Sequence, residues 1–368
     1  MKYWRGYLVA AFLAIATVAI TQFAASHRLL MDMVYPYMVR MLLPEVTAWS
    51  NSVGFCLWQA LLLFVIGGIV LSIVLMILLR WNPVQWFGWI LAISCLFSLV
   101  NNGLFSLGQY STPMAEDLLM EMQDYSVDAL EDAALYYRDK ANVLSRRVNR
   151  DDSGVIFSSF EDLNTQAGEG FRYLTYERGF AIFSGDTSPV KKLGWSDLYS
   201  SKGVTGMTVY LTGESAVNPD MPQVGMPFAI CKEMAKRMMI YNDSEANFAA
   251  FLASTCHDLL PDEFRYSAYL MAYRAIYNTI ANQDSVQARE ITASLDSSVS
   301  VLVKEDLDRY NSFFSSSQAA EGDVLFTDLL VSWHIQEVVI PQTPVEENGF
   351  DPMDETDERL QDIVNKVA

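Results

Sequence analysis

Three long apolar stretches near the N-terminus constrain this chain more than any other feature of its sequence. They cover about residues 6–27, 55–79 and 86–107, and none of them contains a formally charged side chain. Each offers about 20 residues, the length at which an α-helix crosses the hydrocarbon of a bilayer. A helix also satisfies its own backbone hydrogen bonds in lipid. We therefore expect three transmembrane helices within a membrane anchor that covers residues 1–115.

The first apolar stretch has a second interpretation. Lys2, Arg5, the apolar core and the small residues Ala24-Ala25-Ser26 are also typical of a cleaved signal peptide. Both interpretations place the residues that follow on the same side of the membrane. Residues 29–49 then repeat apolar side chains at helical spacing, with Pro36 and Pro44 as expected breakers. They should lie along the membrane surface or pack on the spans.

Charge is distributed unevenly along the chain. Residues 1–115 contain two acids and five bases, whereas residues 116–368 contain 42 acids and 20 bases. No base follows the third stretch until Arg138, which favours export of the domain under the positive-inside rule. An acidic surface repels phosphate backbones, so nucleic acid is not an expected partner. The lipid bilayer is an expected partner.

The sequence after the anchor predicts a mostly helical α+β domain over residues 116–340, followed by an acidic tail over residues 341–368. One strand is expected from Met207 to Leu211, after a glycine-rich entry. Amphipathic or buried helices are expected after Ser126 and over residues 228–239, 244–255, 261–281 and 286–314, the last with possible interruptions. A Cys231–Cys256 bridge is possible in an oxidising compartment, but the spacing does not require one.

The segment Lys232-Glu233-Met234-Ala235-Lys236 carries the most chemical information. Zinc peptidases of the H-E-x-x-H type place two histidines four residues apart, so that both rings face one metal ion. The glutamate between them polarises the metal-bound water. Here the glutamate and the spacing are present, but lysines stand at both metal positions. On an amphipathic helix the same residues can also be a plain solvated face.

The sequence around this segment resembles a bacterial membrane-protein family known as domain-of-unknown-function family 3810, a relative of the zinc peptidases. The resemblance extends from the N-terminal spans to about residue 280. Its main segments are Gly203–Asn218, the helix that begins at Pro227-Phe228, Glu245-Ala-Asn-Phe248 and Phe264–Tyr269. It implies a zincin-like fold for the domain and zinc as the family's cofactor. It also implies a multi-pass protein of the bacterial cytoplasmic membrane, and the charge distribution described above places its C-terminal domain outside the cytoplasm.

The family pattern assigns roles to four residues of this chain. Glu233 takes the general-base position, and the three metal positions are Lys232, Lys236 and Glu245. A lysine ammonium has no lone pair and cannot bind a metal ion until it loses its proton. Its pKa, ordinarily about 10.4, would have to fall by about three units beside a cation and a second lysine. We therefore expect an inactive site without zinc, in which the lysines pair with Glu245 and with Glu233.

The function expected from these features is that of a catalytically inactive, membrane-anchored zinc-metallopeptidase-like protein with a binding or regulatory role in the cell envelope. An exposed strand can pair with an extended peptide. The candidate peptide-binding residues are Met207, Val209, Leu211, Glu214 and Asn218. Two other functions fit the sequence: an active membrane-bound zinc metallopeptidase with unusual ligands, and a structural membrane scaffold. The expected partner is an extended peptide or another membrane protein.

Overall fold

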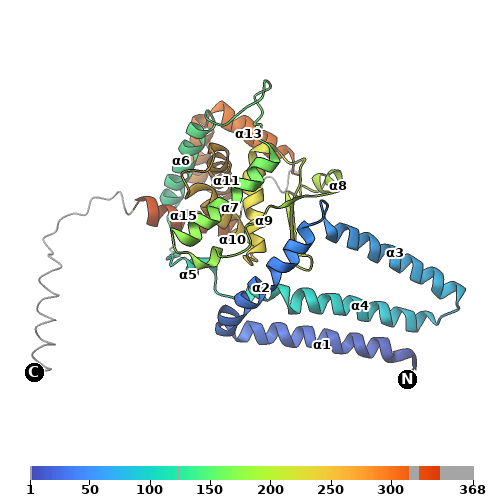
Figure 1. Cartoon of the computed structure of the whole chain (residues 1–368). Helices are drawn as coiled ribbons and strands as arrows, with labels where there is room; N and C mark the ends of the chain where they lie inside the picture. Colours follow the sequence, from blue (N-terminus) through green and yellow to red (C-terminus); the bar gives the residue numbers. More distant parts are fainter. Residues whose placement is uncertain (1, 123, 315–322, 340–368) are drawn as a thin grey trace, which may run out of the picture. The chain divides into compact units, whose positions relative to one another are not determined.

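The computed structural model describes residues 2–122, 124–314 and 323–339, and the chain is mostly helical in these ranges (Figure 1). It divides into two compact units, Met1–Ser332 and Trp333–Ala368. The described part of the second unit is the end of α15 (Val324–His334) and the π-helical turn η5 (Ile335–Val339). The predicted acidic tail, residues 341–368, lies outside the described residues.

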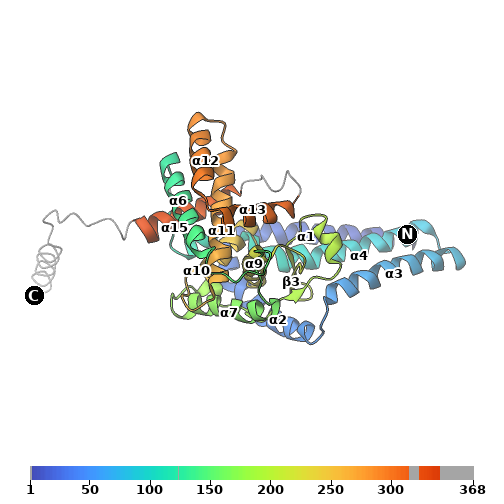
Figure 2. The same ribbon diagram turned by 90° about the horizontal axis from the view of Figure 1, so that it is seen from above.

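Three helices of the first unit are long and apolar enough to cross a membrane. They are α1 (Arg5–Ser26), α3 (Leu57–Leu78) and α4 (Pro83–Gly103), close to the three stretches expected from the sequence. Helices α1 and α4 pack side by side (Figures 1 and 2). A Cβ on Gly6 would lie 2.5 Å from the carbonyl carbon of Gly88. Small residues thus let these two helices approach closely.

The segment between α1 and α3 is a single helix, α2 (Arg28–Asn51). It passes through Pro36 and Pro44, so the prediction that these residues break the helix is wrong. Proline removes one backbone hydrogen bond from a helix, but contacts outside the helix hold α2 in place. Thr47 Oγ1 donates a 2.8 Å hydrogen bond to the carbonyl of Gly213. Helix α2 therefore connects the apolar helices to the domain.

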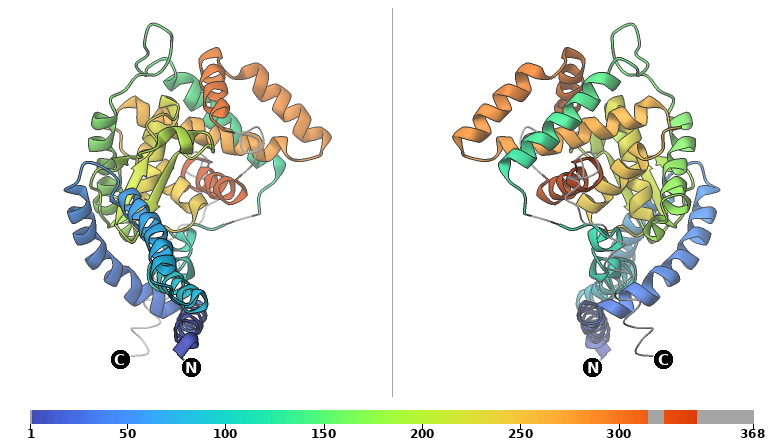
Figure 3. Two further views of the ribbon diagram at one scale, coloured as in Figure 1. Left: turned by 90° about the vertical axis from the view of Figure 1, so that its right-hand side faces the viewer. Right: turned by 90° about the vertical axis from the view of Figure 1, so that its left-hand side faces the viewer.

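The domain consists mainly of helices that gather around α9 (Met226–Arg237) and α10 (Asp243–Thr255) (Figure 3). These two contact each other, and both contact α7 and α11. The other helices are α5 (Met114–Asp117), α6 (Val127–Leu144), α7 (Phe160–Tyr176), α8 (Ser196–Ser200), α11 (Asp262–Ala281), α12 (Val286–Ser298) and α13 (Val301–Ser312). Short 3₁₀ turns are η1 (Lys2–Trp4), η2 (Phe105–Tyr110), η3 (Ala181–Phe183) and η4 (Gln223–Gly225).

The predicted helices of the domain lie within a few residues of their expected positions. Helices α5, α7, α8 and α15 are absent from the prediction. The predicted helix 286–314 is interrupted, and α13 begins anew because Ser300 caps it by accepting a 3.3 Å hydrogen bond from the Val303 N–H. Cys231 and Cys256 are both free thiols, so the possible bridge between them is not formed.

A small sheet lies against α9. Its strands are β1 (Lys191–Lys192), β2 (Gly206–Val209) and β3 (Glu214–Val217), in the order β1-β3-β2. The central strand β3 is parallel to β1 and antiparallel to β2. One face contacts α9 through the Thr208 and Ser215 hydroxyls, and the other packs Ala216 against Cys56 at the start of α3. The sheet therefore connects α9 with a predicted transmembrane helix.

Candidate functional site

Helix α9 presents both motif lysines on one face. Pro227 stands in its first turn, where a missing N–H costs no helical hydrogen bond. Lys232 and Lys236 are four residues apart, so their side chains are neighbours on the helix surface. Each lysine side chain remains 19% exposed, while most of the other residues of α9 are buried. The two ammonium groups therefore mark the part of this helix that a ligand can reach.

Glu233 points toward the sheet and is only 2% exposed. Its Oε2 accepts a 2.7 Å hydrogen bond from Thr208 Oγ1, and its backbone carbonyl accepts a 2.8 Å bond from Ser215 Oγ. A Cβ on Gly206 would lie 2.7 Å from the Glu233 Cγ, so this approach requires glycine. Burial raises the pKa of Glu233, although both neighbouring lysines lower it. The carboxylate is thus a buried anchor between α9 and β2.

Asp243 is the carboxylate that lies beside both lysines. Lys236 Nζ forms an ion pair with Asp243 Oδ1, and Lys232 Nζ lies 4.0 Å from the same oxygen. Burial alone would raise the pKa of Asp243, but the two ammonium groups outweigh it and lower the pKa. Burial lowers the pKa of Lys232, whereas Glu233 and Asp243 raise that of Lys236 against its burial. We call Lys232, Lys236 and Asp243 the lysine–aspartate cluster.

Glu245 does not take the place predicted for it. Its Oε1 accepts a 2.9 Å hydrogen bond from the Met114 N–H, at the start of α5. Burial raises the pKa of this carboxyl group. The predicted pairing of the lysines with Glu245 is therefore wrong in its partner, because α10 directs Asp243, two residues earlier, toward α9. Asn242 caps α10 by accepting a 2.8 Å bond from the Ser244 N–H, which orients this first turn.

The residues at the three metal positions of the family pattern do not fit zinc. Two of the three positions carry ammonium groups beside Asp243, and the third carboxylate is bound to a backbone N–H of another element. Across the described ranges, no group of three or more His, Cys, Asp or Glu side chains could hold a metal ion. Zinc sites use neutral imidazoles, thiolates and carboxylates. The donor set of this cluster therefore supports no metal-assisted step.

The candidate peptide-binding residues lie in different environments. Met207 and Val209 are half-buried on β2, and Leu211 is half-buried in the turn after it. Asn218 is fully buried, donates to Ser200 Oγ and to the Val204 carbonyl at 3.0 Å, and accepts from the Asp220 N–H. Its side chain is used entirely by the loops around β3. Asn218 is thus placed to hold loops and not to touch a peptide.

Glu214 caps a predicted transmembrane helix. It is fully buried, and its two carboxylate oxygens accept hydrogen bonds of 2.8 and 2.9 Å from the N–H groups of Leu57 and Trp58, the first residues of α3. Lys191 Nζ donates to Glu214 Oε1 at 2.5 Å. Negative charge is favourable at a helix N-terminus. Glu214, predicted as a peptide contact, therefore joins the sheet to the apolar helix.

Lys191 completes this connection, which the sequence analysis missed. Besides Glu214, its ammonium donates to the Ser50 carbonyl at 2.7 Å and to the Phe55 carbonyl at 2.9 Å. It thus binds the end of α2 and the turn that leads into α3. No local sequence motif predicts this arrangement, because its residues lie far apart in the sequence. We call Lys191, Glu214 and the start of α3 the helix clamp.

A column of aromatic rings also connects the domain with η2, the turn that follows α4. Tyr210 stacks on Phe105 with ring centroids 6.5 Å apart and on Tyr241 with centroids 5.8 Å apart. The Tyr241 and Ser106 hydroxyls are 2.9 Å apart. Because Tyr210 follows β2 and Tyr241 precedes α10, the column stands beside the lysine–aspartate cluster. The cluster is therefore held on the side of the domain that faces the apolar helices.

Comparison with known families gives one result. The family model described as "Protein of unknown function (DUF3810)" matches residues 31–327, most of the chain. The matched range includes α3 and α4 and every residue of the lysine–aspartate cluster and the helix clamp. No curated protein and no solved structure matches the chain.

Proposed function

This chain belongs to the DUF3810 family of proteins of unknown function, and from that premise we propose that it is an inactive, membrane-anchored relative of the zinc metallopeptidases. Its role is to bind an extended peptide or a membrane-protein partner in the bacterial envelope. The observation that carries this proposal is the ion pair between Lys236 and Asp243, with Lys232 close by, because these lysines stand at the two positions where zinc peptidases have histidines.

The cluster is suited to binding rather than to hydrolysis. Metal-assisted hydrolysis needs a Lewis acid and an activated water beside a general base. Glu233 instead accepts from Thr208 in a buried position between α9 and β2. Lys232 lies beyond hydrogen-bond distance from Asp243. Its ammonium, with three donors, can therefore bind a carbonyl or carboxylate oxygen of a ligand.

Strand β2 supplies the backbone for such a ligand, because it lies at the edge of the sheet. The Asn218 N–H donates to the Thr205 carbonyl at 2.8 Å, which identifies one hydrogen-bonded pair of the ladder. Alternation along an antiparallel pair then directs the backbone groups of Met207 and Val209 toward β3. The backbone groups of Gly206 and Thr208 point to the free edge of β2. An extended peptide would pair with these two residues, each of which is next in sequence to a contact expected from the sequence, Met207 or Val209.

Photo-crosslinking in whole cells tests this binding role. A photo-reactive amino acid replaces Met207, and a matched one replaces Phe157, an exposed apolar residue outside the sheet. We expect crosslinks to a discrete peptide or membrane protein from position 207 and none from position 157. Crosslinks of equal yield from both positions, or from neither, would leave the protein without the proposed binding role.

We propose further that the protein spans the cytoplasmic membrane three times, with its N-terminus inside and the domain outside. Helix α2, between the first two spans, contacts both Gly213 in the domain and Phe105 after the third span. These contacts support the proposal, because three spans bring the ends of α1 and α4 to one side. Alkaline phosphatase fused after residue 340 should be active, and a fusion at Arg80 inactive. The reverse pattern contradicts this orientation.

A further inference from the structure

The loop that contains the short helix α8 holds two large apolar side chains outward. Trp195, which precedes α8, has φ 55° and ψ 39°, a left-handed conformation that bulky residues rarely adopt. It is 42% exposed, and Leu198, three residues later, is 55% exposed. Backbone strain of this kind is concentrated at functional positions. We call residues 194–202 the α8 loop.

The α8 loop is bound to the first turn of α3. Gln59 Nε2 donates a 2.8 Å hydrogen bond to the Gly194 carbonyl, and the Gly194 N–H donates back to Gln59 Oε1 at 3.1 Å. The Tyr199 ring stands edge-on to that of Trp58, with centroids 6.4 Å apart. Figure 1 shows α8 beside the start of α3. The loop and the first turn of α3 therefore lie at the same depth.

The length of α3 sets that depth. Residues 46–79 contain no charged side chain, and Arg80 follows them. A charged side chain is costly in hydrocarbon, so the far edge of the hydrocarbon lies close to Arg80. A core of about 30 Å takes about 20 helical residues at 1.5 Å each, and the span therefore begins at about residue 60. Gln59, and Gly194 bound to it, thus lie at the edge of the hydrocarbon on the domain side. A tilted helix would place them deeper.

The residue types at this depth are those of a membrane interface. Tryptophan and tyrosine gather where the hydrocarbon meets the head groups. Trp81 and Trp86 stand in and just after the turn between α3 and α4, at the far end of the span. Trp58, Tyr199 and Trp195 lie at its near end. The loop therefore supplies part of the second aromatic belt that a spanning α3 requires.

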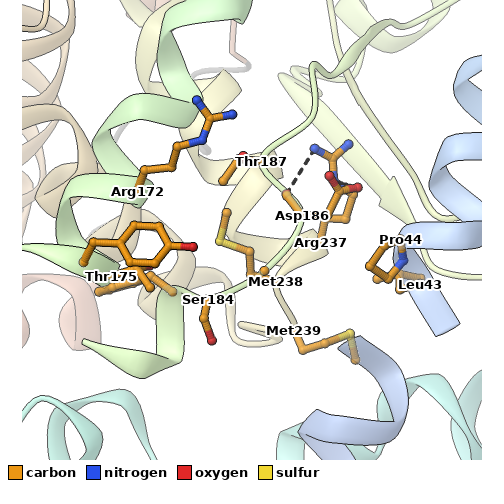
Figure 4. Close-up of a pocket in the computed structure, with 13 residues that line it drawn as sticks. Leu43, Pro44, Arg172, Thr175, Ser184, Asp186, Thr187, Arg237, Met238 and Met239 are labelled. Carbon is orange, nitrogen blue, oxygen red and sulfur yellow. Dashed lines mark hydrogen bonds and ion pairs between the residues drawn. The ribbon is translucent and has the colours of Figure 1, made fainter. Parts of the chain in front are cut away.

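Both ends of the α8 loop are fixed to the core of the domain. Before the loop, the buried Arg237 of α9 donates to the Ser188 carbonyl, and its Nε lies 3.4 Å from Asp186 Oδ2 (Figure 4). At the other end, Asn218 donates a 3.0 Å hydrogen bond to Ser200 Oγ. A segment that is already ordered loses little conformational entropy when it binds. The loop is thus a preformed contact surface.

The charge of this part of the domain does not oppose contact with anionic lipids. Residues 116–368 contain 42 acids and 20 bases, but residues 187–213 contain three lysines and one acid, Asp197. Lys191 belongs to the helix clamp, and Lys192 pairs with Glu161. Lys202 is exposed at the end of the α8 loop and balances Asp197. Basic residues near a bilayer are attracted by anionic head groups.

We infer that the α8 loop is a membrane-contact surface, which inserts Trp195 and Leu198 into the head-group region of the bilayer beside α3. The inference rests on the proposed transmembrane arrangement, because α3 supplies the depth. It adds an attachment that the spans do not provide. Since the loop connects β1 with β2, the bilayer also holds the domain through its sheet.

Photo-crosslinking of the full-length protein to lipid tests this contact. A photo-reactive amino acid replaces Leu198 or, as a matched control, Val143 on α6, which is also 55% exposed. A third variant carries it at Leu71, within α3. Each variant is reconstituted into nanodiscs of phosphatidylethanolamine and phosphatidylglycerol, illuminated and weighed by mass spectrometry. We expect the added mass of one phospholipid at positions 198 and 71, and none at position 143.

The variant at Leu71 separates a failure of this inference from a failure of the transmembrane arrangement. An adduct at position 71 without one at position 198 overturns the inference and leaves the spans in place. Adducts at neither position contradict both. Equal yields at positions 198 and 143 also overturn the inference, because the contact would not be specific to the loop. Capture of a protein in place of lipid by position 198, in illuminated whole cells, would identify a protein interface and exclude the proposed contact.

Discussion

Individual carboxylates in this protein perform different tasks because their surroundings differ. Asp243 is 67% exposed and forms a solvated ion pair with Lys236, an interaction that contributes at most about 1 kcal/mol. Glu214 is fully buried and compensated by an ammonium and two helix N–H groups. Glu245 is satisfied by one N–H and has no cation close by among the groups that set its pKa. These contrasts lead to two predictions at the level of single residues.

Glu214→Gln should destabilise the protein by about 3 kcal/mol. The substitution leaves the Lys191 ammonium buried without its counter-charge and weakens the cap of α3. Thermal unfolding in detergent measures the effect, and Glu161→Gln is the control, because Glu161 forms an exposed pair with the adjacent Lys192. Adding Lys191→Met should restore part of the loss by removing the buried charge. A Glu214→Gln protein as stable as the control would contradict the helix clamp.

Glu245→Gln should be more stable than wild type at pH 7, and its advantage over wild type should be smaller at pH 4. Burial raises the pKa of Glu245 in the folded protein, so its charged form opposes folding. This cost is absent below the unfolded pKa of about 4.3 and grows as pH rises through the folded pKa. Glutamine keeps an acceptor for the Met114 N–H without the charge. The measurement compares the unfolding midpoints of wild type, Glu245→Gln and the exposed control Glu290→Gln between pH 4 and 7. If Glu245→Gln is less stable than wild type at pH 7, the prediction is wrong, and that result is the one expected of a metal ligand.

At the scale of elements, close approaches between backbones fix the position of α9 and α10. Gly170 on α7 faces the Ala253 backbone of α10 so closely that a Cβ would overlap its carbonyl group. Gly206 allows β2 to approach Glu233 on α9 in the same way. The cluster and the sheet are therefore positioned by glycines on neighbouring elements. These contacts fix how closely α7 approaches α10 and how closely β2 approaches α9.

Gly170→Ala should lower the free energy of unfolding by about 1–3 kcal/mol or more. Alanine favours a helix over glycine by about 1 kcal/mol, but the obstacle is a backbone carbonyl that cannot rotate away. Gly54→Ala serves as control, because no atom lies within 4 Å of its added Cβ. Thermal unfolding of both variants in detergent gives the comparison. Equal stability of the two variants would show that α7 and α10 are not in close contact.

Elements with a strong periodic signal could be predicted from the sequence, whereas features made by distant residues could not. The three apolar stretches and helices α10 and α11 were located closely, since length, periodicity and caps such as Asn242 specify them locally. Strand β1 has two residues and exists only because β3 lies beside it. The sequence did not show that Asp243, and not Glu245, lies beside the lysines, because the turn between α9 and α10 decides which carboxylate faces α9. Proline spacing alone misjudged α2, which tertiary contacts keep continuous.

At the scale of the whole molecule, the domain and the apolar helices form one unit. The helix clamp, the Thr47–Gly213 hydrogen bond and the Phe105–Tyr210–Tyr241 column connect them at three places. The lysine–aspartate cluster lies near these connections. A ligand that binds this cluster would therefore contact the part of the domain next to the apolar helices. This fits a binding component of the envelope better than a freely moving peptidase domain.

The metal content of the purified full-length protein, measured together with its peptidase activity, tests the central proposal most directly. The protein is produced with added zinc, purified without chelators and analysed by elemental mass spectrometry beside Glu245→Ala. Because ammonium groups fill two of the three metal positions, we predict zinc far below one ion per chain, the same value for the variant, and no peptide hydrolysis. Stoichiometric zinc that Glu245→Ala removes, accompanied by hydrolysis that disappears with it, would contradict the proposal.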